Sequence, residues 1–253
     1  MDKYVDLLDE SLPFPDHPRR TVWRDYALSG EERAQQPLDR IERVFGLNGR
    51  TLVDIGCGDG GFSIAARRRG CKVIAIDISP QALRRASARY SGRHVEVDLI
   101  RGSGLQLPIK DNTCDVVVLQ DVLEHVSSPV GLLRESIRVL RSGGVCYVSA
   151  VNAHYLRYIF SDPHWGIFGV ALLPHKLGKL YICDLLKVSP VYDVWELPTP
   201  EKIDRWLYSA GFWQLQDQVN RPILHSVFNQ AVISALGFKP QSGQGKTPMP
   251  SYG

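Results

Sequence analysis

The sequence lacks the charge, the long apolar runs and the N-terminal signal that mark several common classes of protein. Its formal net charge is only +3 over 253 residues, too small to indicate binding to nucleic acid or to an anionic membrane. No apolar run approaches the length of a membrane span. The N-terminus, MDKYVDLLDE, lacks the basic start and apolar stretch of a secretory signal. We therefore expect a cytoplasmic protein with no integral membrane segment and no nucleic-acid partner.

Cysteines are few and have no metal-ligand spacing. There are five, Cys57, Cys71, Cys114, Cys146 and Cys183, scattered along the chain, so we expect free thiols in a reducing compartment. What the sequence has instead is an ordinary globular composition, 44% apolar and 23% charged. Its length suits one large domain, or one domain with an elaboration. The assembly state stays open between a monomer and a homodimer.

From residue 51 to residue 151, short apolar segments alternate with segments of helical spacing. The apolar segments are predicted strands at 51–55, 72–77, 95–100, 114–120 and 145–151. Two helices are predicted to begin at Ser79-Pro80 and Ser128-Pro129, because Ser caps a helix and Pro suits its first position. The second of these should end at Gly143-Gly144. This alternation predicts a doubly wound α/β sheet with right-handed crossovers.

The alternation stops after Val151. Residues 152–198 are rich in aromatic, His and Pro residues without a clean period, and a helix capped by Thr199 follows them. The segments WQLQDQV and ILHSVFNQAVISALGF come next, the first a predicted strand and the second either a strand or a helix. We divide the chain into an N-terminal segment with a lid helix (1–45), a main domain (46–238) with 152–198 as an inserted helical cap, and a disordered tail (239–253).

Residues 52–61, LVDIGCGDGG, form a glycine-rich turn between a strand and a helix. Glycines here let the backbone approach a ligand closely, and the start of the helix offers unpaired N–H groups. Asp77, at the end of the second strand, is placed to bind ribose hydroxyls. Ligands bind at the carboxyl ends of parallel strands. These features alone fit a nicotinamide dinucleotide and an adenosyl compound equally well.

Two carboxylates beside this turn favour a cationic ligand. Asp54 and Asp59 would repel a dinucleotide pyrophosphate. S-adenosylmethionine carries an ammonium and a sulfonium group, which a carboxylate attracts. The alternative for Asp54 is a carboxylate that only braces the loop or caps the helix.

Residues 51–151 resemble the class I S-adenosylmethionine-dependent methyltransferases, particularly the small-molecule branch that includes the ubiquinone-biosynthesis type. VDIGCGDG is similar to that family's first motif, and VIAIDIS to its second. RGSGLQLPIKDNTCDVVVLQDVLEHVSSP resembles the stretch from the adenine-contacting loop through the fourth strand, and LLRESIRVLRSGGVCYVSAVN the helix and strand after it. The resemblance implies a Rossmann-like, seven-stranded sheet whose last strand is antiparallel.

The resemblance also implies which residues bind S-adenosylmethionine. Asp77 takes the ribose role, and the other expected contacts are Asp54, Gly56, Cys57, Gly58, Ile78, Ser103, Gly104, Leu105 and Gln120. Ser103 departs from the family, which usually has an Asp there that contacts the adenine amino group. A serine hydroxyl accepts a weaker hydrogen bond than a charged acceptor does.

The N-terminal segment is expected to lie over this site. Residues 1–20 are Pro-rich and should loop over the surface. Trp23, Arg24 and Tyr26 follow in a predicted lid helix, as N-terminal segments do in the family. Arg24 is the candidate partner for the cofactor's carboxylate.

The segment after the fourth strand, QDVLEHV, carries candidate catalytic groups. Asp121, Glu124 and His125 have i, i+3, i+4 spacing, which a helix would place on one face. The matching stretch of ubiquinone-type O-methyltransferases binds a divalent metal through two acids and a His. Asp121 stands where they have the first Glu and shortens the reach. We therefore assign no metal ligand and take His125 as a candidate catalytic residue beside the substrate, with a metal ligand or a structural side chain as the alternatives.

The inserted cap carries the remaining candidates. His164 is a candidate base tuned by Asp162, and Trp165 beside it is a candidate ring-stacking wall. His154, Tyr155, Trp165 and His175 are expected to bind the acceptor. The alternative for each single His is a role in bracing the loop. The apolar run GIFGVALLP suits core packing better than a lipid pocket or a membrane contact.

These residues predict an S-adenosylmethionine-dependent methyltransferase that acts on a small-molecule, lipid-linked or sugar acceptor. O-methylation is favoured, because neutral bases outnumber any thiol- or amine-specific signature. Two alternatives stay open: a nicotinamide-dependent oxidoreductase on a related sheet, and a non-catalytic module that only binds the cofactor.

Overall fold

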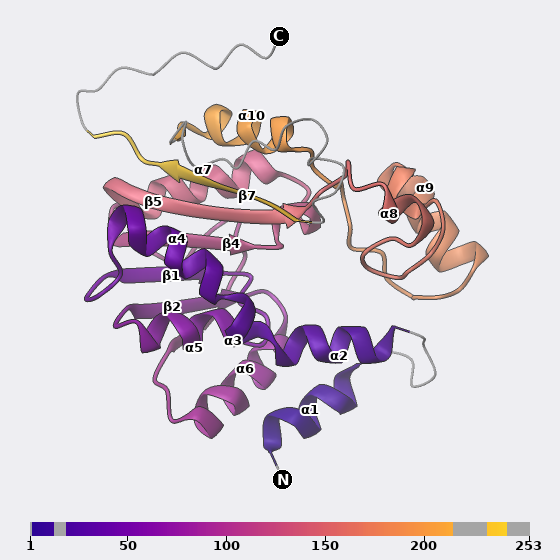
Figure 1. Cartoon of the computed structure of the whole chain (residues 1–253), viewed down its shortest axis with the longest axis horizontal. Helices are drawn as coiled ribbons and strands as arrows, with labels where there is room; N and C mark the ends of the chain where they lie inside the picture. The colour runs from indigo at the N-terminus through magenta and orange to yellow at the C-terminus, as the bar shows by residue number, and fades with distance from the viewer. Residues whose placement is uncertain (1, 13–18, 215–231, 242–253) are drawn as a thin grey trace.

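The computed structural model describes residues 2–12, 19–214 and 232–241. Within them the strands form one mixed sheet in the order β3-β2-β1-β4-β5-β7-β6 (Figure 1). The strands are β1 Thr51–Ile55, β2 Lys72–Asp77, β3 Asp98–Arg101, β4 Cys114–Gln120, β5 Leu140–Val151, β6 Trp213–Gln214 and β7 Val232–Phe238. Strands β1 to β5 are parallel, and β7 is antiparallel to both β5 and β6. The predicted α/β class is confirmed.

Helices cover both faces of this sheet. On one face, α7 (Pro129–Val139) and α10 (Pro200–Ala210) bury Leu132, Leu133, Ile203 and Leu207 against the strands. On the other, α4 (Gln35–Phe45) and α5 (Gly61–Arg68) pack their apolar sides, and α6 (Pro80–Arg93) lies against α5. Strand β4 is buried along almost its whole length. Covering on both faces explains why its sequence is apolar at successive positions rather than alternating.

The predicted helix starts are confirmed by their caps. The hydroxyls of Ser79, Ser128 and Thr199 each accept a hydrogen bond from a backbone N–H in the first turn of their helices. The last turn of α7 differs from the prediction, because the helix ends at Val139 and Leu140 already pairs with Cys114 of β4. The third strand begins at Asp98, three residues later than its apolar pattern suggests.

The end of the chain is described in part. Strand β7 resolves the ambiguous segment in favour of a strand from Val232 onward, and Trp213–Gln214 confirms the start of the strand before it. The predicted disordered tail lies outside the described residues from position 242, as do residues 215–231.

The N-terminal segment is more ordered than its prolines suggest. Instead of a loop, residues Lys3–Ser11 form α1, which begins where the Asp2 side chain accepts a hydrogen bond from the Tyr4 N–H at 3.0 Å. Tyr4 and Leu8 are buried against Ala88 of α6. The expected surface loop over residues 1–20 is therefore wrong for its first half, because α1 has an apolar side to bury. Helix α2 (Arg20–Leu28) and the short α3 (Gly30–Arg33) follow.

Residues 152–198 form a unit beyond the edge where the parallel strands end, and α2 extends toward the same side (Figure 1). This insert holds α8 (Arg157–Phe160), the 3-10 helix η2 (Val170–Leu172), α9 (His175–Lys179) and the π-helix η3 (Leu180–Leu185). It has its own small core of Val170, Ile182, Tyr192 and Val194. None of the helices that the structure describes has the length and apolar character to cross a bilayer.

Helices α3 and α5 pack so closely that the position of Gly61 should not accept a larger residue. We expect Gly61→Ala to lower the free energy of unfolding by about 1–3 kcal/mol, because the added Cβ would lie 2.7 Å from the carbonyl carbon of Gly30. Gly92→Ala in α6 is the matched control, since its Cβ would meet only Asp2 Oδ1 at 3.8 Å. The control should be neutral, or stabilising by up to about 1 kcal/mol. Urea unfolding measures both; an equal effect at the two sites would contradict the close packing.

Candidate active site

The glycine turn after β1 has a backbone that only glycine adopts easily. Gly56 and Gly58 have positive φ angles of 72° and 53°. A Cβ on Gly56 would also lie 2.6 Å from a methyl carbon of Val122, whereas one on Gly58 would meet nothing within 4 Å. The N–H groups of Gly56 and Cys57 both donate to the carbonyl of Ile76 in β2, at 2.8 and 3.0 Å. The turn is thus fixed to β2 and keeps open space beside Gly58.

Asp77 holds this turn in place. Its carboxylate accepts hydrogen bonds from the N–H of Gly58 at 2.9 Å and from the N–H of Ser79 at 2.8 Å. A carboxylate has about four acceptor positions, so these two bonds leave capacity for a ligand. Ile78 next to it is 68% exposed, and Leu105 in the loop after β3 is 40% exposed. Both are predicted cofactor contacts, and both offer apolar surface to a planar ring.

The two carboxylates expected to attract a cation are not open to one. Asp54 is buried and accepts a hydrogen bond from the Ser63 hydroxyl at 2.6 Å, so it braces the turn against α5. Burial raises its pKa to about 6. Asp59 pairs with Arg85 at 2.6 Å and accepts a hydrogen bond from the Tyr4 hydroxyl at 3.2 Å. The expectation that Asp59 faces a sulfonium is wrong, because Arg85 neutralises it.

The other predicted cofactor residues lie at the ends of neighbouring strands. Cys57 is buried, which raises the pKa of its thiol, so it is not a nucleophile. The Ser103 hydroxyl accepts a hydrogen bond from the N–H of Leu105 at 3.2 Å and thus belongs to a local turn. A Cβ on Gly104 would lie 2.6 Å from Leu132. Gln120 ends β4 and is half-buried opposite Ser149 of β5.

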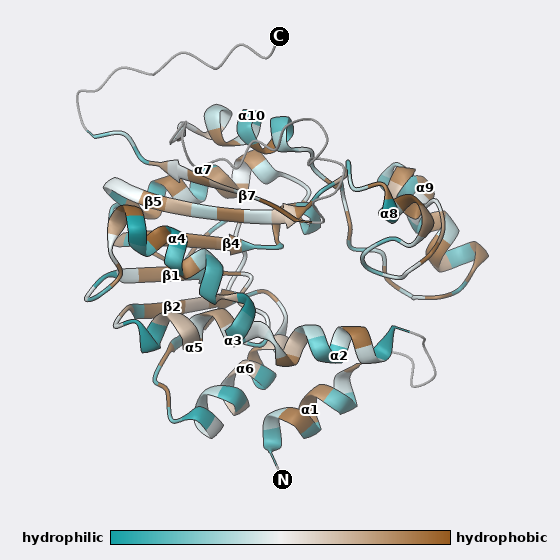
Figure 2. Ribbon diagram, in the orientation of Figure 1, coloured by the Kyte–Doolittle hydropathy of each residue, from teal (hydrophilic) through white to brown (hydrophobic). Residues whose placement is uncertain are grey.

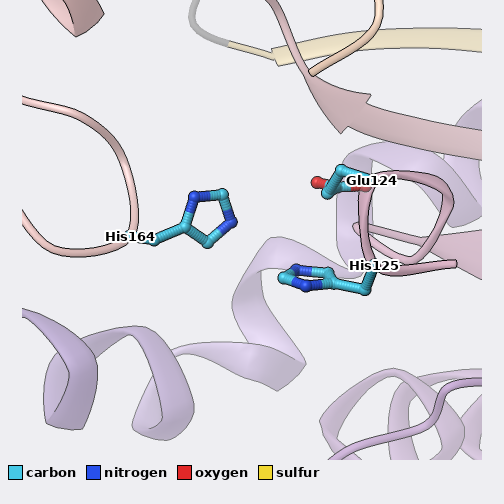
Figure 3. Close-up of side chains that lie close together, drawn as sticks. All are labelled: Glu124, His125 and His164. Atoms are coloured by element: carbon cyan, nitrogen blue, oxygen red, sulfur yellow. The ribbon is translucent and has the colours of Figure 1, made fainter. Parts of the chain in front are cut away.

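Glu124, His125 and His164 come together beyond β4 (Figure 3). Glu124 and His125 lie in the 3-10 helix η1 (Leu123–His125), and His164 reaches them from the insert. One ligand atom from each residue lies within 4.8 Å of the other two. The rings of His125 and His164 meet edge to face, with centroids 5.2 Å apart. The sequence placed these two His residues as candidates separately, and the structure brings them together.

His125 and His164 are half-buried beside the buried Glu124, and the three groups have different proton affinities. Glu124 is fully buried; its Oε1 accepts a hydrogen bond from the Val151 N–H at 3.3 Å, while its Oε2 has no protein partner among the described residues. Burial raises the pKa of Glu124 to about 7. Burial lowers the pKa of His164 to about 3, and the charge of His125 contributes to the same shift. The His164 ring is therefore neutral at physiological pH.

Asp193 completes the cluster and was missed by the sequence analysis. Its Oδ2 lies 3.4 Å from Nδ1 of His125. Burial alone would lower the pKa of His125, but the contact with Asp193 outweighs it, so the pKa of His125 lies above its usual value. Asp193 sits in a segment where Tyr192 and Val194 are buried and their neighbours exposed. The sequence does not carry this alternation, because the exposed Val191 and Trp195 are apolar too, so no local signal marked Asp193.

Asp121 does not share a face with Glu124 and His125. It has a positive φ of 55° and lies before η1, so the helical spacing does not apply. Its carboxylate accepts hydrogen bonds from the hydroxyls of Tyr26 and Ser149. The predicted grouping is therefore wrong: Asp121 joins α2 to the sheet, and His164 takes its place in the cluster.

Asp162 does not contact the His164 ring. It is buried, and its carboxylate accepts hydrogen bonds from the backbone N–H groups of His164, Trp165 and Ile167 at 2.7 to 2.9 Å. The predicted pairing with the imidazole is wrong, because these amides occupy the carboxylate. Asp162 shapes the turn that presents His164 rather than acting on its proton.

The aromatic residues of the insert pack mostly on each other. Trp165 stacks on Tyr192 with centroids 5.0 Å apart, and His175 stacks on Trp195 at 4.3 Å. His175 also places Nδ1 2.8 Å from the carbonyl of Val194. A hollow beside them is lined by His164, Trp165, Tyr192 and Trp195 among others. His175 thus braces the insert.

Two further predicted acceptor residues lie at the start of the insert. The His154 N–H donates to the side chain of Asn152 at 3.0 Å. The Tyr155 ring meets Tyr158 edge to face, with centroids 4.8 Å apart. Their expected contact with an acceptor stays a prediction.

Helix α2 contacts the insert at the same place. The indole N–H of Trp23 donates to the carbonyl of His164 at 2.9 Å, and Arg19 donates to the carbonyl of Pro163 at 2.9 Å. Arg24 pairs with Asp9 of α1 at 2.6 Å. The expected contact of Arg24 with the cofactor's carboxylate stays a prediction, because this exposed ion pair uses only part of the guanidinium.

Comparison with known proteins identifies the sheet and its turn. The family described as "Methyltransferase domain" matches residues 53–148. The ubiquinone biosynthesis O-methyltransferase of Pseudomonas fluorescens is 31% identical over 173 residues, which cover 68% of this chain and 68% of that protein. The same-named protein of Psychrobacter arcticus is 29% identical, over 66% of this chain. This chain spans only 60% of the length of that relative.

Solved structures share the fold. An S-adenosylmethionine-dependent methyltransferase from Mesorhizobium loti aligns with a TM-score of 0.59 at 19% identity, over 81% of this chain and 98% of that one. Magnesium protoporphyrin IX methyltransferase from Synechocystis, solved with S-adenosylhomocysteine bound, aligns with a TM-score of 0.56 at 15% identity, over 89% of each chain. Identities this low support the fold alone. Together with the 31% identical relative, of which this chain covers 68%, they show that the protein belongs to the class I S-adenosylmethionine-dependent methyltransferases.

Proposed function

We propose that the protein transfers the methyl group of S-adenosylmethionine to a hydroxyl group of a small-molecule, lipid-linked or sugar acceptor. The observation that carries the proposal is the contact of the half-buried His125 with the carboxylate of Asp193, beside His164, at the carboxyl end of β4. A hydroxyl must lose its proton during methyl transfer, and an imidazole oriented by a carboxylate can take it. The similarity to proteins named O-methyltransferases supports the same acceptor atom.

The cofactor residues follow from the edge where the parallel strands end. Asp77 binds the ribose, Ile78 and Leu105 hold the adenine, and the turn at Gly56 and Gly58 lies along the methionine part. S-adenosylmethionine supplies a methyl group on a positive sulfur, and its carbon–sulfur bond breaks as the new carbon–oxygen bond forms. The class I arrangement of seven strands, with residues 152–198 as an acceptor-binding cap, completes the proposal.

His125 accepts the acceptor's proton. Its Nδ1 faces Asp193, which leaves Nε2 for the hydroxyl. Asp193 stabilises the imidazolium that forms. The neutral ring of His164 offers a hydrogen bond that orients the acceptor. Trp165 and Trp195 line the hollow beside His164, and their flat faces exclude water from the reacting atoms.

The same cluster also fits a divalent cation. One carboxylate and two imidazoles are a ligand set that suits zinc, manganese or iron, and the unpartnered Oε2 of the buried Glu124 is the oxygen that would bind it. Glu124, His125 and His164 would hold the ion, which would lower the pKa of a bound hydroxyl. Dialysis against a chelator distinguishes this from the His125 base, because only the metal-dependent reaction would stop and then recover with added metal.

The acceptor class is the first thing to measure. We expect label from radiolabelled S-adenosylmethionine to enter one of three fractions of a cell extract, containing lipids, glycans or small metabolites. The fraction that takes up label identifies the acceptor class. Binding of S-adenosylhomocysteine with no label in any fraction would favour a non-catalytic module, and tight binding of NADH instead would favour the oxidoreductase alternative.

Asp77 should be needed for cofactor affinity. We expect Asp77→Ala to weaken binding of S-adenosylhomocysteine by about 10- to 100-fold, because a charged hydrogen-bond acceptor is worth about 1.5–3 kcal/mol. Calorimetric titration measures the affinity. Asp98→Ala at the start of β3 is the control for loss of one carboxylate and should bind normally. Unchanged affinity in the Asp77 variant would show that the ribose lies elsewhere.

Asp193 should set the pH dependence of the reaction. Because Asp193 raises the pKa of His125, and because the base must be neutral, Asp193→Asn should move the rising acid limb of the kcat/KM profile to lower pH. His125→Gln should lower kcat by about 10²- to 10⁴-fold and leave S-adenosylhomocysteine affinity unchanged. A profile that does not move in the Asp193 variant would reduce Asp193 to a structural contact.

A further inference from the structure

Trp195 is a half-exposed aromatic residue beside the candidate catalytic groups. It is 47% exposed, although a tryptophan is costly to leave in water. Exposure alone does not distinguish it, because the insert exposes other large apolar residues and its helices carry apolar stretches (Figure 2). Its place does distinguish it, since Trp195 lines the same hollow as His164.

The backbone holds Trp195 close to the rest of the cluster. Its N–H donates to the carbonyl of Glu124 at 2.7 Å. Exposed and buried residues alternate over 191–195, as they do along an extended segment, and in such a segment residues two apart point to the same side. Trp195 therefore lies on the same side as Asp193, whose carboxylate contacts His125.

His175 supports the indole ring from one face. The two rings are nearly parallel, with 3° between their planes and centroids 4.3 Å apart. His175 is itself held, because its Nδ1 lies 2.8 Å from the carbonyl oxygen of Val194. With one face covered by His175, the exposed area of Trp195 belongs to its other face and its edge. A flat surface that is fixed before a ligand arrives costs that ligand less ordering free energy.

Trp165, which was expected to form the stacking wall, has less surface to offer. It stacks on Tyr192, with 24° between the ring planes and centroids 5.0 Å apart. It also packs against the small core of the insert. Trp165 therefore contributes to the packing of the insert, while Trp195 keeps a face for a ligand.

The carboxylates near Trp195 already have partners. Glu196 forms an ion pair with Lys202, and Asp193 contacts His125 at 3.4 Å. An aromatic face also attracts a cation, but the two carboxylates that would add to that attraction are occupied. The surroundings of Trp195 thus offer hydrogen-bonding groups and suit an uncharged ligand better than a cationic amine.

We propose that Trp195 is the residue on which the acceptor of the proposed methyl transfer stacks a neutral ring that bears the reacting hydroxyl. Two residues of extended chain span about 7 Å, so the edge of a ring on Trp195 comes within reach of His125, the partner of Asp193. The negative face of an indole attracts the C–H groups of a sugar ring and also stacks with a phenol. The shared chemistry is therefore a flat, uncharged ring with a hydroxyl at its edge. This proposal rests on the proposed function and names a residue that selects its acceptor.

NMR titration of the full chain with S-adenosylhomocysteine present tests the stacking apart from catalysis. The probes are methyl β-glucopyranoside for a sugar ring, phenol for an aromatic ring and tetramethylammonium for a cation. We expect one of the two neutral rings to bind, and the one that binds identifies the source. Trp195→Ala should weaken its binding by about 10- to 100-fold, the order that one stacked ring contributes. Trp195→Phe should recover most of the affinity because it keeps a flat face, and Trp195→Leu should not.

Methyl transfer from radiolabelled S-adenosylmethionine to the ring that binds gives the second readout. Trp195→Ala should raise KM for that ring and change kcat little, because stacking holds the acceptor equally before and during transfer. Phe168→Ala is the matched control, since Phe168 is another exposed aromatic residue of the insert and is not among the described residues that line the hollow. It should bind and react like the wild type. Thermal melting checks that each variant is folded.

The two readouts separate the two proposals. Binding of tetramethylammonium in place of both rings would overturn the stacking proposal, as would equal affinity of the wild type and Trp195→Ala for the ring. Turnover of the ring with an unchanged KM in Trp195→Ala would overturn it as well. Binding that depends on Trp195 without any methyl transfer would count only against the proposed function.

Discussion

The Asp77 carboxylate is the contact on which the cofactor side of this molecule depends. It bonds the N–H of Gly58 in the turn after β1 and the N–H of Ser79 at the start of α6. One side chain thereby joins two strand ends that parallel pairing has already placed side by side, with Ile55 opposite Ile76. A fixed turn costs a ligand less ordering free energy than a mobile one. The turn, the exposed Ile78 and the start of α6 therefore form one prearranged surface.

A second set of contacts joins the insert to the end of β4. The backbone N–H of Trp195 donates to the carbonyl of Glu124 at 2.7 Å, and Asp193 and His164 approach His125 from the same unit. Helix α2 adds the bond from Trp23 to the His164 carbonyl. The candidate base and the groups that tune it thus come from segments far apart in the sequence. A displacement of the insert would alter the proton affinity of His125 as well as access to it.

How far the sequence predicts this structure depends on whether local rules decide the outcome. Ser79, Ser128 and Thr199 were identified as caps because a cap depends on its nearest neighbours. The predicted grouping of Asp121 with Glu124 and His125 was wrong because it assumed an α-helix. The backbone at Asp121 is instead in the left-handed region, and only a single 3-10 turn follows it. Helix α1 was missed because its apolar residues bury against α6, a contact that composition cannot show.

The same distinction explains the candidate site. The places of the glycine turn and of Asp77 were predicted correctly because they follow from position along β1 and β2, while their roles in cofactor binding stay predictions. The prediction for Asp162 was wrong because its closeness to His164 in the sequence suggested a contact with the imidazole ring. An Asp side chain in a turn instead accepts hydrogen bonds from the backbone N–H groups that follow it. Asp193 lies 68 residues after His125, and nothing local connects them. Long-range pairs of this kind need the tertiary structure.

The cluster of Glu124, His125, His164 and Asp193 is arranged so that its members differ in proton affinity. Burial raises the pKa of Glu124 to about 7 and lowers that of His164 to about 3, while Asp193 keeps the pKa of His125 above its usual value. Neighbouring groups whose environments push their pKa values apart can take different roles in one reaction. A proton that enters the cluster goes to His125 or Glu124 rather than to His164. His164 therefore remains an uncharged hydrogen-bonding group, and under the proposed function the acceptor's proton goes to His125, whose Nδ1 faces Asp193.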